Sequence, residues 1–302
     1  MRIKSTITAP LLVLLVYVLL ILSRLLDLNI LQSGDNVYLT MIVLQLLILV
    51  LPAFFYCKLK GEGFAGKLRL KLFAPRKWLT VFYAFGVLVC GSALINLGMH
   101  YLFGVQSTVD YSAIPSGSPN LLSILYVAVT FAVVPAFAEE FLFRGVFLAE
   151  YAPNGSITAA LVSALLFAMV HFNARGALVY FFGGLVFAFV TYVTDSLLCS
   201  MLLHMLYNLF GIFLEGYVWS LIMKPNSLVF FLFTVTTLFF VFLLLALHDA
   251  ERLYYIRGVR GDPSPPEEKR AYYGTRALSD GLFSPGVLAC ILFFLIVVVV
   301  QA

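Results

Sequence analysis

Long apolar runs constrain this chain more than any other feature of its sequence. A helix needs about 20 predominantly apolar residues to cross the hydrocarbon core of a bilayer, with some latitude when it tilts. Apolar runs occupy roughly residues 10–22, 38–57, 78–104, 119–150, 156–173, 176–194, 196–215, 227–247 and 286–300. The chain is 62% hydrophobic and 11% charged, whereas soluble domains are about 45–50% apolar and about 25% charged. An ordinary soluble protein is therefore excluded, and we predict an all-α, polytopic transmembrane bundle of about eight or nine helices.

The runs and the polar stretches between them divide the chain into three regions. Residues 1–118 hold the first transmembrane helices and a basic loop, and residues 119–215 form a helical core that contains the unusual polar groups. Residues 216–302 hold the last helices and a polar segment, 248–285, that is rich in glycine and proline. That composition is typical of a loop, so we predict a cytoplasmic connector without much packed structure.

The distribution of Lys and Arg predicts how the bundle is oriented. The loop between the second and third runs contains seven basic residues against Glu62 alone: Lys58, Lys60, Lys67, Arg69, Lys71, Arg76 and Lys77. Short loops with an excess of Lys and Arg face the cytoplasm. Alternating from this loop puts the N-terminus, with Arg2 and Lys4, in the cytoplasm as well. We expect an integral, multi-pass protein of the plasma membrane.

Charge and cysteine usage argue against nucleic-acid binding, a disulfide framework and a cysteine metal site. The net charge is only +4, and the basic residues occur in blocks without the aromatic-interleaved stripe of a nucleic-acid-binding protein. Cys57, Cys90, Cys199 and Cys290 lie in or beside apolar runs and form no C-x-x-C pair. They are interpreted as small packing residues, because neither a disulfide framework nor a cysteine metal site has this pattern.

Three of the runs contain polar groups where such groups are costly. The fourth, fifth and seventh runs contain, in order, Glu139, Glu140 and Arg144; His171; and His204 and Asn208. Ionisable side chains inside a membrane usually face the interior of the bundle and mark function. Each group alone has a structural explanation as an ion pair or as interhelical hydrogen bonding. Together, on separate helices, they favour a functional site.

Helical spacing sorts these groups into roles. Glu140 and Arg144 lie four residues apart, so they share a helix face and can form an ion pair. Glu139 points about 100° away from that face and is left available for chemistry. His204 and Asn208 are also four residues apart, and we expect both side chains to point at one bound group.

Counting residues from the turns places three of these groups at similar depths. Glu139 lies roughly 18 Å from the turn at residues 151–156, and His171 lies roughly 23 Å from it on the following helix. His204 lies roughly 14 Å from the short turn near Asp195. Helices joined by short connections are antiparallel neighbours, so the carboxylate and the imidazoles can line one cavity.

Such a cluster suits the hydrolysis of an amide by water. Glu139 with His171 can act as a general base for a water molecule, and His204 with Asn208 offers N–H donors for a tetrahedral oxyanion. The ion pair of Glu140 would then hold the helix in place.

Three spaced motifs resemble a known family. They are Glu139-Glu-x-x-x-Arg144, Phe167-x-x-x-His171 and His204-x-x-x-Asn208. This ordered set resembles the signature of the CPBP family, also called Abi, which comprises type II CAAX prenyl proteases and bacteriocin-processing or self-immunity proteins. The resemblance covers roughly residues 120–212. It implies an intramembrane endopeptidase in which Glu139 and His171 activate water and His204 and Asn208 bind the oxyanion, while Glu140 and Arg144 support the site.

The resemblance leaves the mechanism and the partner open at several points. Two histidines and a carboxylate are also a known zinc set, but the spacing does not demand a metal, so metal-free glutamate chemistry without a cofactor ranks first. A non-catalytic membrane scaffold or a bacteriocin self-immunity protein is the main alternative. A proton-coupled transporter fits less well, because no inverted repeat is visible. The expected partner is a membrane-associated protein or peptide; its prenylation and the oligomeric state are not determined by the sequence.

Overall fold

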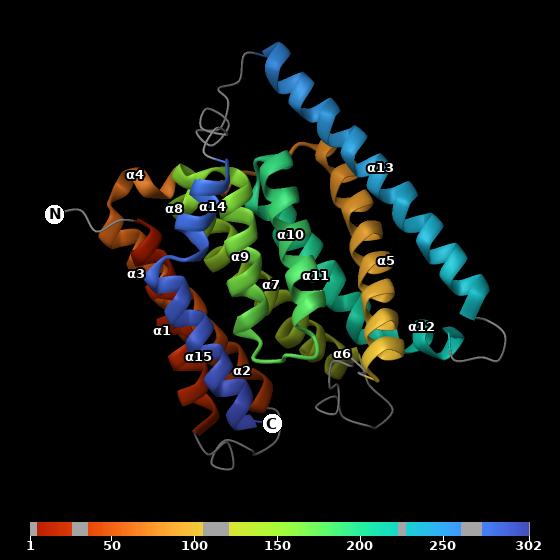
Figure 1. The fold of residues 1–302 in the computed structure, drawn as a ribbon, viewed down its shortest axis with the longest axis horizontal. Helices are drawn as coiled ribbons and strands as arrows, with labels where there is room; N and C mark the ends of the chain where they lie inside the picture. Colours follow the sequence, from red (N-terminus) through yellow and green to blue (C-terminus); the bar gives the residue numbers. More distant parts are fainter. Residues whose placement is uncertain (1–4, 26–35, 105–120, 223–227, 261–273, 302) are drawn as a thin grey trace.

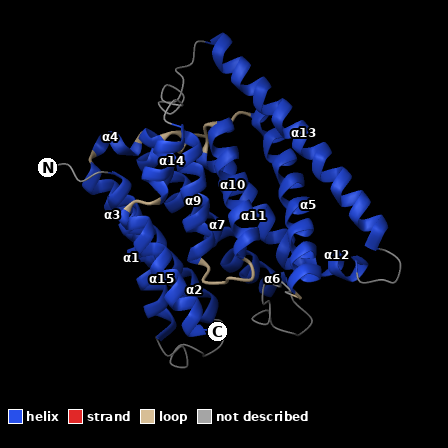
Figure 2. Ribbon diagram, in the orientation of Figure 1, coloured by secondary structure: helices blue, strands red, loops and turns tan. Residues whose placement is uncertain are grey.

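The described part of the chain is a bundle of helices (Figure 1). The computed structural model describes residues 5–25, 36–104, 121–222, 228–260 and 274–301. Its α-helices are α1 (Ser5–Leu25), α2 (Asn36–Gln45), α3 (Leu51–Lys60), α4 (Glu62–Ala65), α5 (Trp78–Phe103), α6 (Leu121–Ala128), α7 (Val134–Glu140), α8 (Leu148–Tyr151), α9 (Ser156–Val170), α10 (Ala177–Thr194), α11 (Leu197–Phe213), α12 (Glu215–Ile222), α13 (Leu228–Arg260), α14 (Gly274–Leu282) and α15 (Pro285–Gln301). Within these ranges no strand occurs, as Figure 2 shows.

The helices coincide with the predicted apolar runs. Six helical stretches are long and apolar enough to cross a membrane: Ile7–Arg24, Val37–Lys60, Pro75–Phe103, Leu121–Asn154, Ala177–Thr194 and Leu228–Arg260. Three shorter apolar helices, Ser156–Val170, Leu197–Phe213 and Pro285–Gln301, account for the remaining runs. The predicted all-α, polytopic bundle is therefore confirmed, and the protein is an integral, multi-pass membrane protein.

Two of the long helices contain wide turns just before a proline. A π-helical segment, Leu46–Val50, joins α2 to α3 ahead of Pro52, and another, Val129–Val133, joins α6 to α7 ahead of Pro135. A proline ring clashes with the carbonyl four residues earlier in a regular α-helix, and a wider turn relieves that clash. Both helices therefore continue through their prolines instead of ending there.

A third wide turn lies next to the candidate site and has no proline. The π-helical segment Phe141–Phe147 follows Glu140 directly and joins α7 to α8. Single π-helical turns within α-helices are frequent at functional sites. Every residue of this segment is buried, so the altered helical register is held in place by packing on all sides.

The centre of the bundle is formed by α7, α9, α10 and α11. These helices share one continuous core of buried apolar residues, including Ala138, Leu166, Phe187 and Leu203. Helix α5 packs on α10 and α11, and α13 packs on α5 at the outside of the bundle (Figure 1). The helices that carry the predicted site residues thus lie inside a surrounding layer of other helices.

The prediction of a loosely structured connector at 248–285 is wrong for its described parts. Helix α13 continues to Arg260, well past the end of its apolar run, and α14 lies within the same segment. The buried Asp249 accepts a 2.5 Å hydrogen bond from Thr80 of α5 and pairs with Arg252 at 2.6 Å. These contacts stabilise the polar extension of α13 against α5, and composition alone does not reveal them. Residues 261–273 lie outside the described part of the chain.

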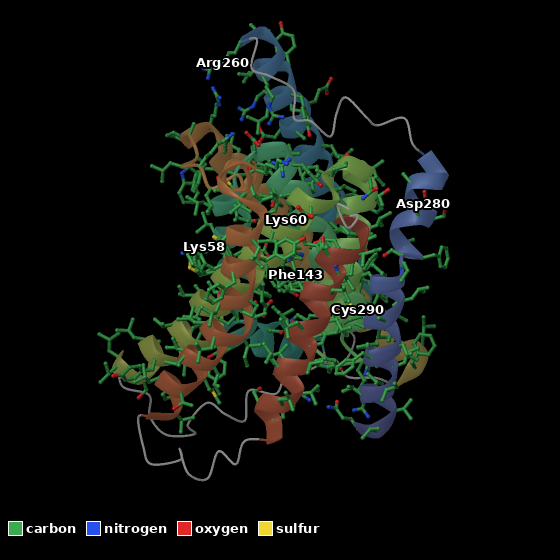
Figure 3. All side chains as sticks on the ribbon, turned by 90° about the vertical axis from the view of Figure 1, so that its left-hand side faces the viewer. Lys58, Lys60, Phe143, Arg260, Asp280 and Cys290 are labelled. Atoms are coloured by element: carbon green, nitrogen blue, oxygen red, sulfur yellow. The ribbon has the colours of Figure 1, made fainter. Side chains whose placement is uncertain are left out.

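The first and last helices pack together along one side of the bundle. Helix α15, which contains Cys290, continues below α14 with Asp280 (Figure 3), and it packs against α1. The thiol of Cys290 lies 3.3 Å from the carbonyl oxygen of Pro10. Regions that are distant in the sequence thereby form one wall of the bundle.

Candidate active site

Three side chains from three different parts of the bundle converge on one point. Oε2 of Glu139, near the end of α7, lies 4.0 Å from Nε2 of His171 and 3.9 Å from Nε2 of His204 on α11. Oε2 makes no hydrogen bond within the described structure. The three side chains are 15%, 24% and 6% exposed, so the gap between them is shielded but not sealed. A water molecule with hydrogen bonds of about 2.8 Å could bridge the Glu139 oxygen and either imidazole nitrogen at this separation.

Glu140 sits behind this gap in a fully buried position. Its Oε1 accepts a 2.9 Å hydrogen bond from Nη1 of Arg144 and a 3.1 Å hydrogen bond from Nδ1 of His204. The ion pair expected from the four-residue spacing is present, although Arg144 lies within the π-helical segment that follows Glu140. The bond to His204 was not expected, because the sequence does not indicate which of the two carboxylates faces α11. Glu140 therefore connects the ion pair to one of the imidazoles.

Arg144 is accommodated by hydrogen bonding and by aromatic rings. Its Nη2 donates to the carbonyl oxygen of Gly184 at 3.1 Å, and its guanidinium carbon lies 4.3 Å from the ring centre of Phe167 and 5.2 Å from that of Phe187. Rings within about 6 Å attract a cation, most strongly where water is excluded. These contacts, with the Glu140 carboxylate, compensate for burying the arginine completely.

The hydrogen bonds of the two imidazoles fix which nitrogen faces Glu139. Nδ1 of His171 lies 2.9 Å from the carbonyl oxygen of Phe167, which can only accept, so this nitrogen carries the hydrogen. Nδ1 of His204 likewise donates to the Glu140 carboxylate. In each neutral ring, Nε2 is then the acceptor. Both imidazoles thus present a lone pair toward the side of Glu139, and each can take up a proton there.

Aromatic stacking holds both imidazole rings. His171 stacks on Tyr180 of α10, with 3.9 Å between ring centres and 11° between planes. His204 stacks on Phe187 at 4.5 Å and 20°, and Phe167 contacts both imidazoles edge-on. Nothing in the spacing distinguishes Tyr180 from the other tyrosines of the chain, so sequence reasoning assigned it no role.

His171 lies at the end of α9 and begins the short turn to α10. The next residue, Phe172, has a positive φ of 48°, and Oδ1 of Asn173 accepts hydrogen bonds from the amides of Arg175 and Gly176. The ring of Phe172 packs edge-on against Tyr17 of α1 at 5.4 Å. The turn that carries His171 is thus held by its own hydrogen bonds and by the outer wall.

No described hydrogen bond or ion pair joins the Asn208 side chain to the other candidate residues. It lies one helical turn after His204 on α11 and is half-buried, and none of the described hydrogen bonds involves its side chain. The expectation that it points at the same bound group as His204 remains a prediction.

The candidate site has the donor types of a zinc site but not its geometry. Among the described residues, no group of three His, Cys, Asp or Glu side chains is arranged to hold one. Zinc takes nitrogen and oxygen ligands at about 2.0–2.1 Å in a tetrahedron, which puts the ligand atoms about 3.4 Å apart. The carboxylate oxygen of Glu139 lies farther than this from both imidazole nitrogens. The donor types suit zinc but their spacing does not.

Comparison with known proteins identifies the central helices. Residues 121–210 match the family model described as type II CAAX prenyl endopeptidase Rce1-like. The match covers this segment, which is less than half of the chain. The Rce1-like segment extends from α6 to α11 and includes all six predicted site residues. No curated protein and no solved structure matches the chain. The Rce1-like match supports a CAAX-type intramembrane protease as the general class of the protein.

Proposed function

We propose that this protein is an intramembrane endopeptidase of the glutamic type. It hydrolyses a peptide bond in a membrane-associated protein or peptide with water activated by Glu139 and His171. The observation behind this proposal is the convergence of the Glu139 carboxylate and two imidazole lone pairs on one gap of about 4 Å, within an Rce1-like segment. We assign the chemistry to residues 119–215, with the flanking helices as its support.

The proposed reaction begins with proton transfer from water. Glu139 and His171 accept a proton as the water oxygen attacks the carbonyl carbon of the peptide, which forms a tetrahedral oxyanion. The same pair then delivers that proton to the leaving amine as the carbon–nitrogen bond breaks. The products are one carboxylic acid and one amine, so the two groups return to their starting state.

The oxyanion needs donors at the moment it forms. His204 supplies one through Nε2 only in its protonated form, because its Nδ1 hydrogen is already given to Glu140. The Glu140 carboxylate that accepts this hydrogen also accepts a hydrogen bond from Arg144 on its other side, so the His204 ring is held with Nε2 toward Glu139. Asn208 would supply a second donor through its side-chain amide, which requires no change of charge.

The test is the hydrolysis of a membrane-tethered peptide library by the purified protein, followed by mass spectrometry. Glu139→Gln keeps the shape of the side chain and removes its basicity, so cleavage should fall about 10²- to 10⁴-fold. Glu251→Gln removes an exposed carboxylate of α13 and serves as the matched control. Undiminished cleavage by Glu139→Gln would reject the mechanism and favour the non-catalytic scaffold or immunity protein.

Orientation and location complete the proposal. The N-terminus is placed in the cytoplasm of a plasma-membrane protein on the basis of the basic loop between α3 and α5.

A further inference from the structure

The two ends of the bundle differ sharply in charge. We define the basic face as the end formed by Lys58, Lys60, Lys67, Arg69, Lys71, Arg76, Lys77, Arg252, Arg257 and Arg260. Its members from distant parts of the chain are held together, because Arg252 donates to the carbonyl oxygen of Arg76. Asp195 also pairs with both Arg69 and Lys71. At the opposite end, the basic side chains with a described position are Arg24 and Arg175.

The protein is closed between the candidate site and the basic face. After Glu140 the chain continues through the π-helical segment and α8 toward that face, where Glu150 of α8 pairs with Lys60 at 2.8 Å. Along this path the side chains of Phe143, Val146, Phe147 and Tyr151 are buried to within about one percent. On α11, the residues between the basic face and His204 are equally closed, with Leu197, Ser200 and Leu203 fully buried. These buried layers leave water and substrate no described route from the basic face.

The same helices open on the other side of the site. Beyond His204, every residue of α11 is half-buried or exposed. The turn that follows His171 is exposed at Ala174 and Arg175, and His171 has the most exposed side chain of the converging trio. Exposure therefore increases from the site toward the end opposite the basic face.

Helix lengths place this opening in a recess. Helices α9 and α11 have 15 and 17 residues, about 22 and 26 Å at 1.5 Å per residue, which is less than a bilayer core of about 30 Å. Helix α5 has 26 residues, about 39 Å. Figure 2 shows the turn between α9 and α10 ending nearer the middle of the molecule than the ends of α1 and α15. The site is thus reached from within the membrane thickness on that side.

We propose that the active site opens to the extracytoplasmic side of the membrane and takes a polypeptide segment presented from that side. The access route follows from the exposure of the two faces, and its direction follows from the rule that basic ends face the cytoplasm. The substrate class rests on the proposed protease function. A peptide displayed on the cytoplasmic side is the competing substrate, and it would meet the closed basic face.

Cysteine labelling tests the access route without relying on activity. In a Cys57→Ser background, Ala174→Cys places a thiol on the exposed turn beside the site, and Lys67→Cys places one on the basic face. A membrane-impermeant maleimide should label Ala174→Cys in intact cells and Lys67→Cys only after permeabilisation. The reverse pattern would overturn the inference.

Oriented reporters test the substrate class. Two single-span reporters share one transmembrane anchor and one mixed-sequence segment beside it, which lies outside the cell in one reporter and inside in the other. The outside reporter alone should be cut, and Glu139→Gln should abolish the cut. Cleavage of the inside reporter, alone or with the other, overturns the inference while the protease proposal stands. Cleavage of neither by the wild type rejects the protease proposal and the substrate class, and labelling still decides the access route.

Discussion

Gly184 is the position where a single methyl group should disturb both the packing and the candidate site. A Cβ at Gly184 would lie 2.8 Å from Cα and 2.9 Å from Cβ of Ala164 on α9, and 3.2 Å from Nη2 of Arg144. The nearest of these is a backbone atom, which cannot rotate away, so α9 and α10 must separate. Overpacking of this kind costs about 1–3 kcal/mol.

Gly183 provides a matched control on the same helix. A Cβ there would meet Leu88 and Phe187 at 3.7 Å, which is ordinary van der Waals contact. Both Gly→Ala changes gain the same helix propensity, about 1 kcal/mol, so the difference between the two variants isolates the cost of overpacking. We expect Gly184→Ala to be about 1–3 kcal/mol less stable than Gly183→Ala.

Thermal unfolding in detergent and cleavage of the tethered peptide library measure the two consequences. Gly184→Ala should unfold at a lower temperature than Gly183→Ala, and it should also lose activity, because Arg144 can no longer hold both Gly184 and Glu140. Gly183→Ala should retain wild-type cleavage. Equal stability and equal activity of the two variants would refute the reasoning from the close approach of α9 and α10.

Two further predictions separate the roles of neighbouring groups. Glu140→Gln leaves the charge of Arg144 buried without its partner, so the free energy of unfolding should fall by about 3–5 kcal/mol. Glu139→Gln should change stability little, because Oε2 of Glu139 makes no hydrogen bond with the described residues. Thermal unfolding of the two variants in detergent checks this, and a Glu140→Gln variant as stable as the wild type would contradict it. Tyr180→Phe keeps the ring under His171 and should preserve kcat, whereas Tyr180→Leu should lower kcat with little change in KM; equal kcat for the two variants would show that the stacking does not position His171.

The secondary structure was largely predictable, because the bilayer imposes a minimum length on each apolar helix. The nine runs correspond to helices with similar bounds. Two of the runs contain a proline, at 52 and 135, and in both the helix continues past the proline through a wider turn. The prediction failed where the stabilising contact is between distant residues. Helix α13 extends past its apolar run because the buried Asp249 accepts a hydrogen bond from Thr80 and pairs with Arg252. Hydropathy does not predict contacts of this kind.

The sequence predicted which residues form the candidate site, but it did not predict the hydrogen bonds between them. Intramembrane charges are rare and costly, so Glu139, Glu140 and Arg144 stood out, and helical spacing paired the last two. The bond from His204 to Glu140 depends on how α11 is rotated against α7. That rotation is a property of the packed bundle.

Local physics thus accounts for the helices, their membrane character and the choice of polar residues, since each depends only on residues within a few turns. The folded bundle alone decides which nitrogen of each imidazole faces Glu139, that Tyr180 supports His171, and which end of the site is closed. These features depend on contacts between segments far apart in the chain. Hydropathy and spacing along one helix contain no information about the neighbour across the interface.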